Sequence, residues 1–446
     1  GWRRGRSTSA LVRLPIRSTW TATPRAAARR DRHRQLTVDA RQGNPVKMTL
    51  DDPGAEIQPS SGFGLSHGRW NLGMTRSGTR PTALYVVPSR QPGLIYTAET
   101  TWVNKDVSPG PVIYSLVDRR TGGIPDDPTY HARQQDLAKV TATYRASGVA
   151  ATGTPMAGAR ISDVPGASMI WPVRDVTLPA TVIHYRTPGL TYESGLEVGG
   201  SVIFDGGRQA KPGQTSEVWN VAVTGPSFLL PGGSRTGDSL LFSGAGLFAD
   251  GGEGRSGSDS AATGTATLAR DGHVLATADL TGCSVYESHK CRLHADLPAG
   301  RGTYSLTASL RRQVPYSALS TGVESVWTFR SGTTTEEQPL PLMAVRYSPE
   351  GLDDSNRAEP GSVTRLPLRI ERNPGSARAK ATSVRLEMSA DDGATWRPVP
   401  VTRTGSGWTA MLTNPPTAGF VSLRATVTDT AGDGVTQTIT RAYAVG

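Results

Sequence analysis

The sequence has only two cysteines, no long apolar run and no complete set of catalytic residues. A membrane helix needs roughly 20 consecutive apolar residues. No segment approaches that length, so we expect no membrane span. A phosphate-binding loop, a G-x-S-x-G elbow and a D-x-x-H segment are all missing, which excludes the commonest nucleotide-binding and hydrolase signatures. The residues by themselves therefore predict a scaffold that requires no cofactor.

The excess positive charge, formally +10, is concentrated at the N-terminal end. Residues 1–34 hold ten arginines against one acid, Asp31, which leaves 38 basic and 37 acidic side chains for the rest of the chain. A body so close to neutral does not attract a polyanion, so we expect no nucleic-acid partner. We expect residues 1–35 to form a basic, disordered tail, and weak phosphate binding by this tail remains an alternative. The chain starts at Gly1 instead of Met, which suggests a fragment or a misread start.

Cys283 and Cys291 are the only cysteines, eight positions apart between two strand-like segments. We expect them to form a disulfide that closes the loop between two hairpin arms. The alternative is a metal site that adds His289 and His294 to both thiols, but the close spacing of zinc modules is absent. A paired cysteine favours an oxidising, extracellular compartment.

Glycine and proline are frequent, at 51 and 32 residues, and they separate short segments of alternating apolar and polar residues. This pattern favours strands joined by turns. The sequence therefore predicts an all-β fold of tandem β-sandwich or jelly-roll-like domains that ends in an immunoglobulin-like domain.

The first β-rich stretch spans residues 36–228 and comprises one or two domains. Leu36–Ala40 and Val46–Leu50 alternate on both sides of a Gly-Asn-Pro turn and predict a hairpin. The best helix candidate is Gln134–Tyr144, although its valine, threonine and tyrosine content suits a strand equally well.

Two further domains follow. Residues 229–333 predict a β-sandwich or jelly roll that carries the cysteine pair, with a two-residue hairpin turn at Asp271-Gly272. A polar linker after Arg330 leads to residues 341–446, whose strand spacing predicts the immunoglobulin-like sandwich. We expect Trp396 and Trp408 to be core aromatics of this last domain.

Two tetra- or pentapeptides look like hydrolase motifs and are assigned to local structure. Gly153-Thr154-Pro155-Met156-Ala157 is similar to the G-T-S-M-A element of subtilases, but Pro155 stands where the nucleophilic serine must be. Gly237-Asp238-Ser239-Leu240 matches the GDSL tetrapeptide, so an esterase at Ser239 is the third functional hypothesis. It needs a histidine and an aspartate within hydrogen-bond distance, and we expect a turn and the start of a strand instead.

One segment fits the Asp-box pattern S-x-D-x-G-x-T-W without departure. Its residues are Ser389, Asp391, Gly393, Thr395 and Trp396. We expect Asp391 to accept hydrogen bonds from the turn, Gly393 to supply the positive φ and Trp396 to pack beneath the hairpin. This motif marks a structural turn and not an active site.

Two acidic loops carry hard oxygen ligands of the kind that Ca²⁺ takes in secreted proteins. The first contains Asp250, Glu253 and Asp259, and the second contains Asp353 and Asp354. Neither has the EF-hand pattern, so we favour solvated surface loops over calcium sites.

Several segments in residues 229–446 carry a family likeness when they are taken in order. They include "RDGHVLATADL", "GTYSLTASLRR", "LEMSADDGATWRPVPV" and "RATVTDTAGDGVTQTI". Together they resemble the C-terminal region of actinobacterial secreted subtilisin-like serine peptidases, downstream of the protease domain. The strands from Leu36 onward look like the same region.

The resemblance implies a non-catalytic accessory region, or the product of a truncated gene, that stabilises or targets a protease. Its partners would be the catalytic subtilase domain, in cis or in trans, and polymeric substrate or cell wall. The family's catalytic residues lie in a domain that these segments do not contain, so none is carried over. We expect a secreted monomer. The alternative is a free-standing extracellular protein that binds carbohydrate or a cell surface, which a row of exposed aromatic side chains would favour.

Overall fold

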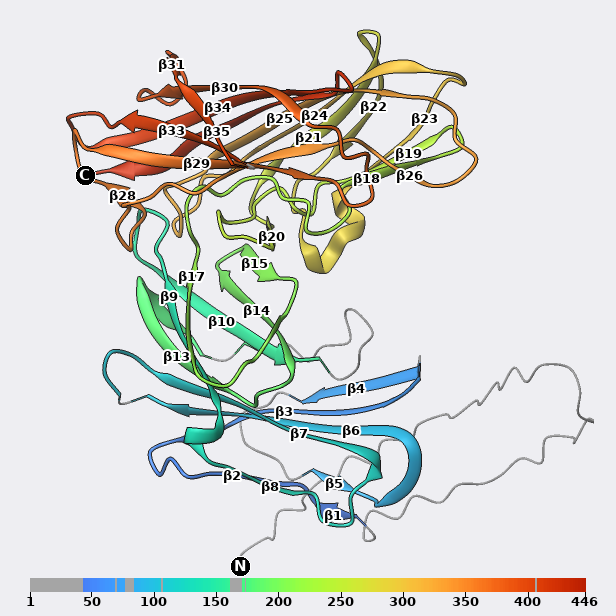
Figure 1. The fold of residues 1–446 in the computed structure, drawn as a ribbon, viewed down its shortest axis with the longest axis vertical. Helices are drawn as coiled ribbons and strands as arrows, with labels where there is room; N and C mark the ends of the chain where they lie inside the picture. The colour runs from blue at the N-terminus through green and yellow to red at the C-terminus, as the bar shows by residue number, and fades with distance from the viewer. Residues whose placement is uncertain are drawn as a thin grey trace, which may run out of the picture.

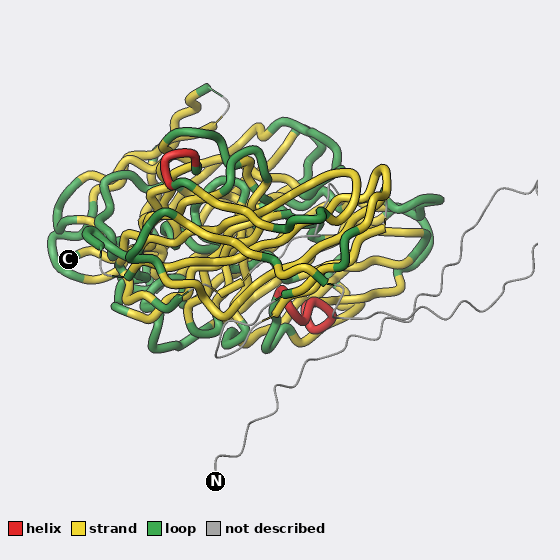
Figure 2. The backbone as a smooth tube through the Cα atoms, turned by 90° about the horizontal axis from the view of Figure 1, so that it is seen from below, coloured by secondary structure: helices red, strands yellow, loops and turns green. Residues whose placement is uncertain are grey.

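The computed structural model describes residues 43–68, 70–76, 84–105, 107–160, 171–172, 174–405 and 407–446. Strands dominate this part of the chain, and helical structure is limited to two short 3-10 segments (Figures 1 and 2). The predicted all-β sandwich architecture is confirmed. No helix among the described residues is long and apolar enough to cross a membrane. The basic tail, residues 1–35, and the hairpin arm Leu36–Ala40 lie outside the described residues.

A seven-stranded sheet forms the centre of the N-terminal half (Figure 1). In spatial order its strands are β17 (Gln214–Trp219), β9 (Ala138–Tyr144), β13 (Ala180–Arg186), β7 (Val112–Ile124), β6 (Ser89–Asn104), β3 (Glu56–His67) and β4 (Trp70–Arg76). Two of its pairings are parallel, β17 with β9 and β13 with β7. Residues 112–117 of β7 are buried on both faces, so this sheet lies between two layers.

The layer on one face of the central sheet is a second sheet. It contains β11 (Trp171–Pro172), β10 (Ala151–Ala159), β14 (Thr191–Val198), β15 (Ser201–Asp205) and β20 (Arg255–Asp259), with β12 (Val176–Leu178) and β16 (Arg208–Gln209) at its sides. Ile113 and Val182 of the central sheet share a core with Leu196 and Ile203 of this layer.

Two short ribbons cover part of the opposite face. They are β1 (Asn44–Pro45) with β5 (Tyr85–Val86), and β2 (Lys47–Leu50) with β8 (Thr129–Ala132). Met48 and Val86 pack there against Tyr96 and Tyr114 of the central sheet. The segment expected as a second hairpin arm, Val46–Leu50, therefore forms strand β2, which pairs in parallel with β8.

A nine-stranded sheet runs through the C-terminal half. Its order is β22 (His273–Asp279), β21 (Thr263–Arg270), β24 (Gly302–Arg311), β25 (Gly322–Ser331), β35 (Gly434–Val445), β34 (Gly419–Asp429), β30 (Ala381–Ser389) and β31 (Arg397–Val399), with β28 (Arg357–Ala358) beside β35. Because β25 pairs with β35, the segments on either side of the predicted linker share one hydrogen-bonded sheet.

Two four-stranded sheets pack against the nine-stranded sheet through one continuous core. The first contains β23 (Arg292–Asp296), β19 (Ser239–Ser243), β18 (Gly233–Thr236) and β26 (Gln338–Pro339). The second contains β27 (Met343–Tyr347), β29 (Val363–Arg372), β33 (Gly407–Thr413) and β32 (Val401–Thr404). Trp327 is 1% exposed, lies 5.6 Å from the Phe242 ring and donates its indole N–H to Met343 O at 2.6 Å.

The expectation that Trp396 and Trp408 are core aromatics is corrected, because both are only half-buried. Trp408 packs at the margin of the core, and the Arg424 guanidinium lies 4.3 Å from the Trp396 ring centroid. Trp327 and Tyr443 fill the interior instead.

The local turn and strand predictions have separate outcomes. Asp271 and Gly272 have φ angles of 50° and 84° and join β21 to β22, which confirms the two-residue hairpin turn.

The ambiguous segment Gln134–Tyr144 forms the 3-10 turn η2 (Gln134–Asp136) and then strand β9. Its β-branched residues, which alternate between buried and half-buried positions, favour the strand.

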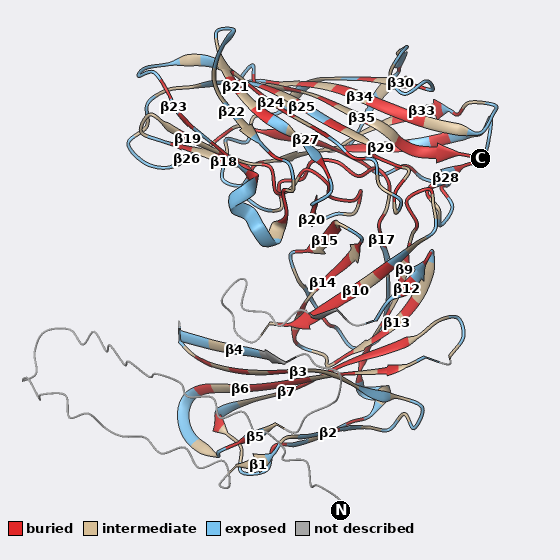
Figure 3. Cartoon of the chain, turned by 180° about the vertical axis from the view of Figure 1, so that it is seen from behind, coloured by how far each residue is buried: buried red, intermediate tan, exposed pale blue. Residues whose placement is uncertain are grey.

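The disulfide between Cys283 and Cys291 is confirmed, with a Cα separation of 4.9 Å. Its setting differs from the prediction, because the bond closes the 3-10 segment η3 (Val285–Cys291) instead of a hairpin loop. The flanking strands β22 and β23 belong to different sheets. Both cysteines are buried, whereas residues 286–290 are exposed (Figure 3). The bond therefore fixes a surface loop at the crossing from one sheet to the other.

Replacing both Cys283 and Cys291 with serine should lower the free energy of unfolding by about 2 to 3 kcal/mol, because the unfolded chain regains the entropy of a nine-residue loop. Urea denaturation of the oxidised parent and the double variant measures the difference. Equal midpoints and equal slopes would contradict the prediction.

Candidate functional site

The subtilase-like pentapeptide Gly153–Ala157 lies inside strand β10. Pro155 is buried and faces Leu196 of β14 in the sheet register. A nucleophile needs an exposed turn with a base beside it. This segment is a sheet interior, in agreement with the assignment of the motif to local structure.

The structure places a histidine beside Ser239 that sequence reasoning missed. Ser239 begins β19, and its Oγ lies 2.8 Å from Nε2 of His294 on the neighbouring strand β23. The contact is exposed, and no described residue bonds the other ring nitrogen of His294. Asp238, the nearest acid in sequence, instead binds Arg235 at 2.6 Å and Thr333 at 2.6 Å. The described residues thus provide a serine and a histidine but no orienting carboxylate.

The Asp-box residues form a compact turn. The Asp391 carboxylate accepts hydrogen bonds from the Thr395 amide at 2.8 Å and the Thr395 hydroxyl at 2.6 Å, and Ser389 donates to it at 2.7 Å. These bonds lower the pKa of Asp391 to about 2, the Thr395 hydroxyl contributing most. Gly393 has a φ of 92°, and a Cβ there would lie 3.2 Å from the Trp396 ring. The side-chain oxygens of Ser389, Asp391 and Thr395 are all used within the turn.

Glu253 of the first acidic loop is exposed, as expected, but Asp250 and Asp259 are not solvated, which corrects the sequence expectation for these two residues. Asp250 and Asp259 are 0% and 1% exposed, and each pairs with a buried arginine, Arg255 at 2.6 Å and Arg312 at 2.5 Å. Among the residues that the structure describes, no three His, Cys, Asp or Glu side chains are grouped so that they could hold a metal.

The second acidic loop remains exposed. Asp353 accepts from the amides of Ser355 and Arg357, both at 2.8 Å, and Asp354 lies 3.7 Å from Arg145. One oxygen of Asp353 shapes this turn, and Asp354 pairs weakly with Arg145, the residue after β9.

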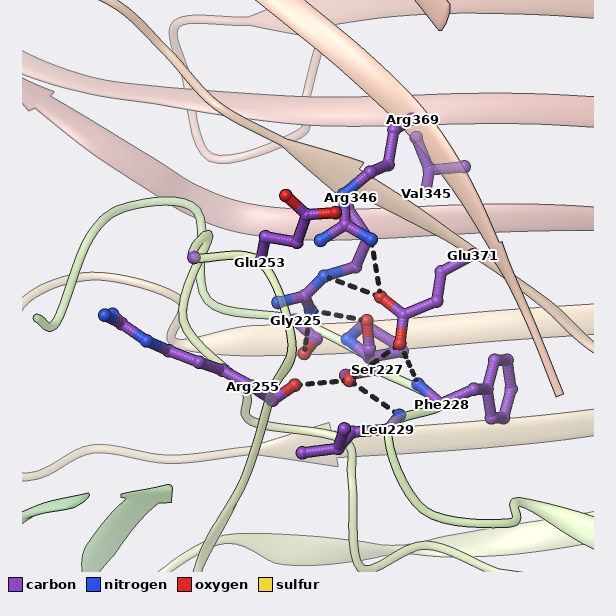
Figure 4. A network of polar contacts seen from close by, with 12 residues as sticks. Gly225, Ser227, Phe228, Leu229, Glu253, Arg255, Val345, Arg346, Arg369 and Glu371 are labelled. Carbon is purple, nitrogen blue, oxygen red and sulfur yellow. Dashed lines mark hydrogen bonds and ion pairs between the residues drawn. The ribbon is translucent and has the colours of Figure 1, made fainter. Parts of the chain in front are cut away.

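The most extensive buried polar site is centred on Arg346 of β27 (Figure 4). Its guanidinium donates to the carbonyls of Gly225 at 3.2 Å, Pro226 at 2.7 Å and Asp250. Its Nε lies 3.5 Å from the Glu371 carboxylate of β29. Burial lowers the pKa of Arg346 to about 10, so the side chain remains cationic at neutral pH.

Glu371 extends this Arg346 cluster toward the chain that leads into β18. Its Oε1 accepts from the Phe228 amide at 2.7 Å and lies 3.0 Å from Ser227 Oγ, while Oε2 pairs with Arg369 at 3.0 Å. The Arg346 cluster therefore bonds the second four-stranded sheet to two connecting segments. Residues 225–228 lie between β17 and β18, and residue 250 lies between β19 and β20.

A cleft of about 360 Å³ opens next to the Arg346 cluster. Its lining includes Glu253, Arg365, Arg369, Thr404 and Trp408. Arg365 and Arg369 are paired with Glu350 and Glu371, so their charges are already compensated. The cleft offers polar contacts for a ligand, among them the exposed Glu253 carboxylate.

Comparisons with protein-family models and with curated proteins find no match to this chain.

Replacing Arg346 with methionine should lower the free energy of unfolding by about 3 to 5 kcal/mol, because the Glu371 charge and three backbone carbonyls lose a buried partner. As a control, Arg365→Met removes an exposed ion pair and should cost less than about 1 kcal/mol. Chemical denaturation of both variants provides the test. A cost for Arg346→Met no larger than that of the control would contradict the assigned role.

Proposed function

We propose that this chain is a non-catalytic extracellular region that accompanies a subtilisin-like serine peptidase, as an accessory region or a truncated product, and stabilises or targets the protease. The family likeness of residues 229–446 motivates the proposal. The observation that carries the proposal is that buried arginines pair with carboxylates inside the fold and do not face a cavity. Arg346, Arg255 and Arg312 are all buried and bound to carboxylates, so they hold layers together. In an active site such groups would face a substrate cavity.

The layered architecture supports a positioning role. One sheet of nine strands contains strands from both C-terminal segments. A disulfide fixes the loop that crosses from this sheet to the first four-stranded sheet. A layered body of this kind would hold an attached protease domain at a defined distance from the opposite end of the body. The disulfide is compatible with an oxidising compartment.

Binding of carbohydrate or of a cell surface is the second candidate. Three aromatic side chains of the described residues are more than half exposed. They are Trp70 on β4, Tyr85 on β5 and Tyr286 on η3, and they do not form a row. A stacking platform is thus not what favours this candidate. The feature that favours it is the presence of open clefts lined by polar side chains.

The purified chain should be inert toward proteins and esters. Pro155 lacks a hydroxyl, and the Ser239 and His294 pair has no orienting carboxylate among the described residues. We expect no cleavage of casein, no labelling by a fluorophosphonate, and equal hydrolysis of p-nitrophenyl acetate by the parent and Ser239→Ala. Fluorophosphonate-sensitive cleavage, or esterase activity lost in Ser239→Ala, would contradict the proposal.

The reading frame upstream of the Gly1 codon tests the link to a peptidase. We expect an in-frame subtilase domain with its Asp, His and Ser motifs. A start codon followed by a signal peptide and no protease, with no subtilase gene beside it, would favour the free-standing binding protein instead.

A further inference from the structure

A second cleft, of about 510 Å³, opens where β9 and β17 begin. Its polar lining comes from Asp51, Gln134, Gln135, Lys139, Tyr185 and Gln214. The sheet register makes Gln214, Lys139 and Tyr185 direct neighbours on three adjacent strands, β17, β9 and β13. Since side chains directly opposite in a sheet lie on the same face, these three form a row at the floor of the cleft.

The aromatic and amide groups of the cleft are held in place by their neighbours on the same sheet face. The Tyr185 ring stacks on the buried Tyr114 ring at 5.2 Å with an interplanar angle of 11°. The side-chain Nε2 of Gln134 donates to the Tyr185 hydroxyl at 2.8 Å, and the backbone N–H of Gln134 donates to Asp51 Oδ1 at 2.9 Å. Tyr114 in turn donates to Asp52 at 2.6 Å. Fixed groups of this kind bind a ligand without an ordering cost.

Other groups of the cleft remain available. Within the described part of the chain, no hydrogen bond or ion pair involves the side chains of Gln135, Lys139 or Gln214. They supply two amides, each a donor and an acceptor, and one ammonium donor, while Asp51 adds an acceptor and balances the charge of Lys139. Such a balanced set suits neighbouring hydroxyl groups, which donate and accept at once. A phosphate would require excess positive charge, and an apolar ligand would leave these groups unpaired.

Hydroxyl-bearing side chains continue along the same sheet face beyond the cleft. Two residues further along the strands Ser216 is opposite Thr141, and after another two residues Thr143 is opposite Thr181. The apolar Ile183 and Val218 occupy the remaining positions of these two rows. Each two-residue step advances about 7 Å along a strand. The hydroxyl-bearing face thus extends past a single sugar ring, which favours a chain over a monosaccharide.

We propose that this cleft, with the face of β17, β9 and β13 that continues from it, binds a neutral polysaccharide chain through hydrogen bonds from Gln135, Lys139 and Gln214. The site goes beyond the accessory role and holds whether or not a peptidase is attached. In a protein anchored to polymeric material it would supply the contact.

Retention on insoluble cellulose, chitin and xylan tests the site, with the full chain in physiological salt. We expect retention on at least one polymer, and at least a tenfold weaker Kd for the triple variant Gln135→Ala, Lys139→Ala, Gln214→Ala. The matched control replaces the exposed Gln91, Gln209 and Lys211 with alanine and should bind like the parent. Tyr185→Phe keeps the ring stack but removes the acceptor for Gln134, so it should weaken binding less than the triple variant.

Unchanged melting temperatures of the triple variant and the control establish that both remain folded. No retention of the parent on any neutral polymer, retention on anionic polymers only, or equal affinity of triple variant and parent would overturn the site. None of these outcomes bears on the upstream reading frame, so the polysaccharide site and the peptidase link fail separately.

Discussion

The buried guanidinium of Arg346 is the interaction on which the packing of residues 225–228 and 250 against the second four-stranded sheet depends. It is 3% exposed and donates to backbone carbonyls at residues 225, 226 and 250, while Glu371 balances its charge. The Ala249 amide also donates to the Gly225 carbonyl at 2.9 Å, and a guanidinium with five donors can serve several buried carbonyls at once. The cost of burying this charge is offset only because each partner is in place, so the arrangement is specific as well as stabilising.

The same solution recurs at two neighbouring places. Arg255 pairs with Asp250, and its guanidinium lies 3.8 Å from the Trp219 ring centroid. Arg312 pairs with Asp259, and its guanidinium lies 4.8 Å from the Phe248 ring. Both acids come from the loop and strand around β20, so this stretch is held by arginines and aromatic rings. These charged groups are thereby used to support the fold and are not available to a ligand.

The exposed face of the central sheet has a different character. Ribbons β1 with β5 and β2 with β8 cover the part around β6 and β7. On β17 the residues Gln214, Ser216 and Val218 remain exposed. A polar face left uncovered beside a layered, rigid body is suited to recognition of an extended polymer, and it makes a positioning role and a binding role compatible in one chain.

Local features were accessible from the sequence by itself. Alternation of apolar residues and frequent turns predicted an all-β chain, Asp271-Gly272 predicted a hairpin turn, and two cysteines predicted one disulfide. Each of these depends on residues close together in the chain. The tertiary structure alone decided the rest. Arg346 binds carbonyls 121 and 120 residues away, and Ser239 meets His294 across 55 residues. Sheet registers bring Gln214 beside Lys139 and join β25 to β35. Such pairings leave no periodic or spacing signal, because which strands become neighbours is determined by burial of the whole core and not by the residues within either strand.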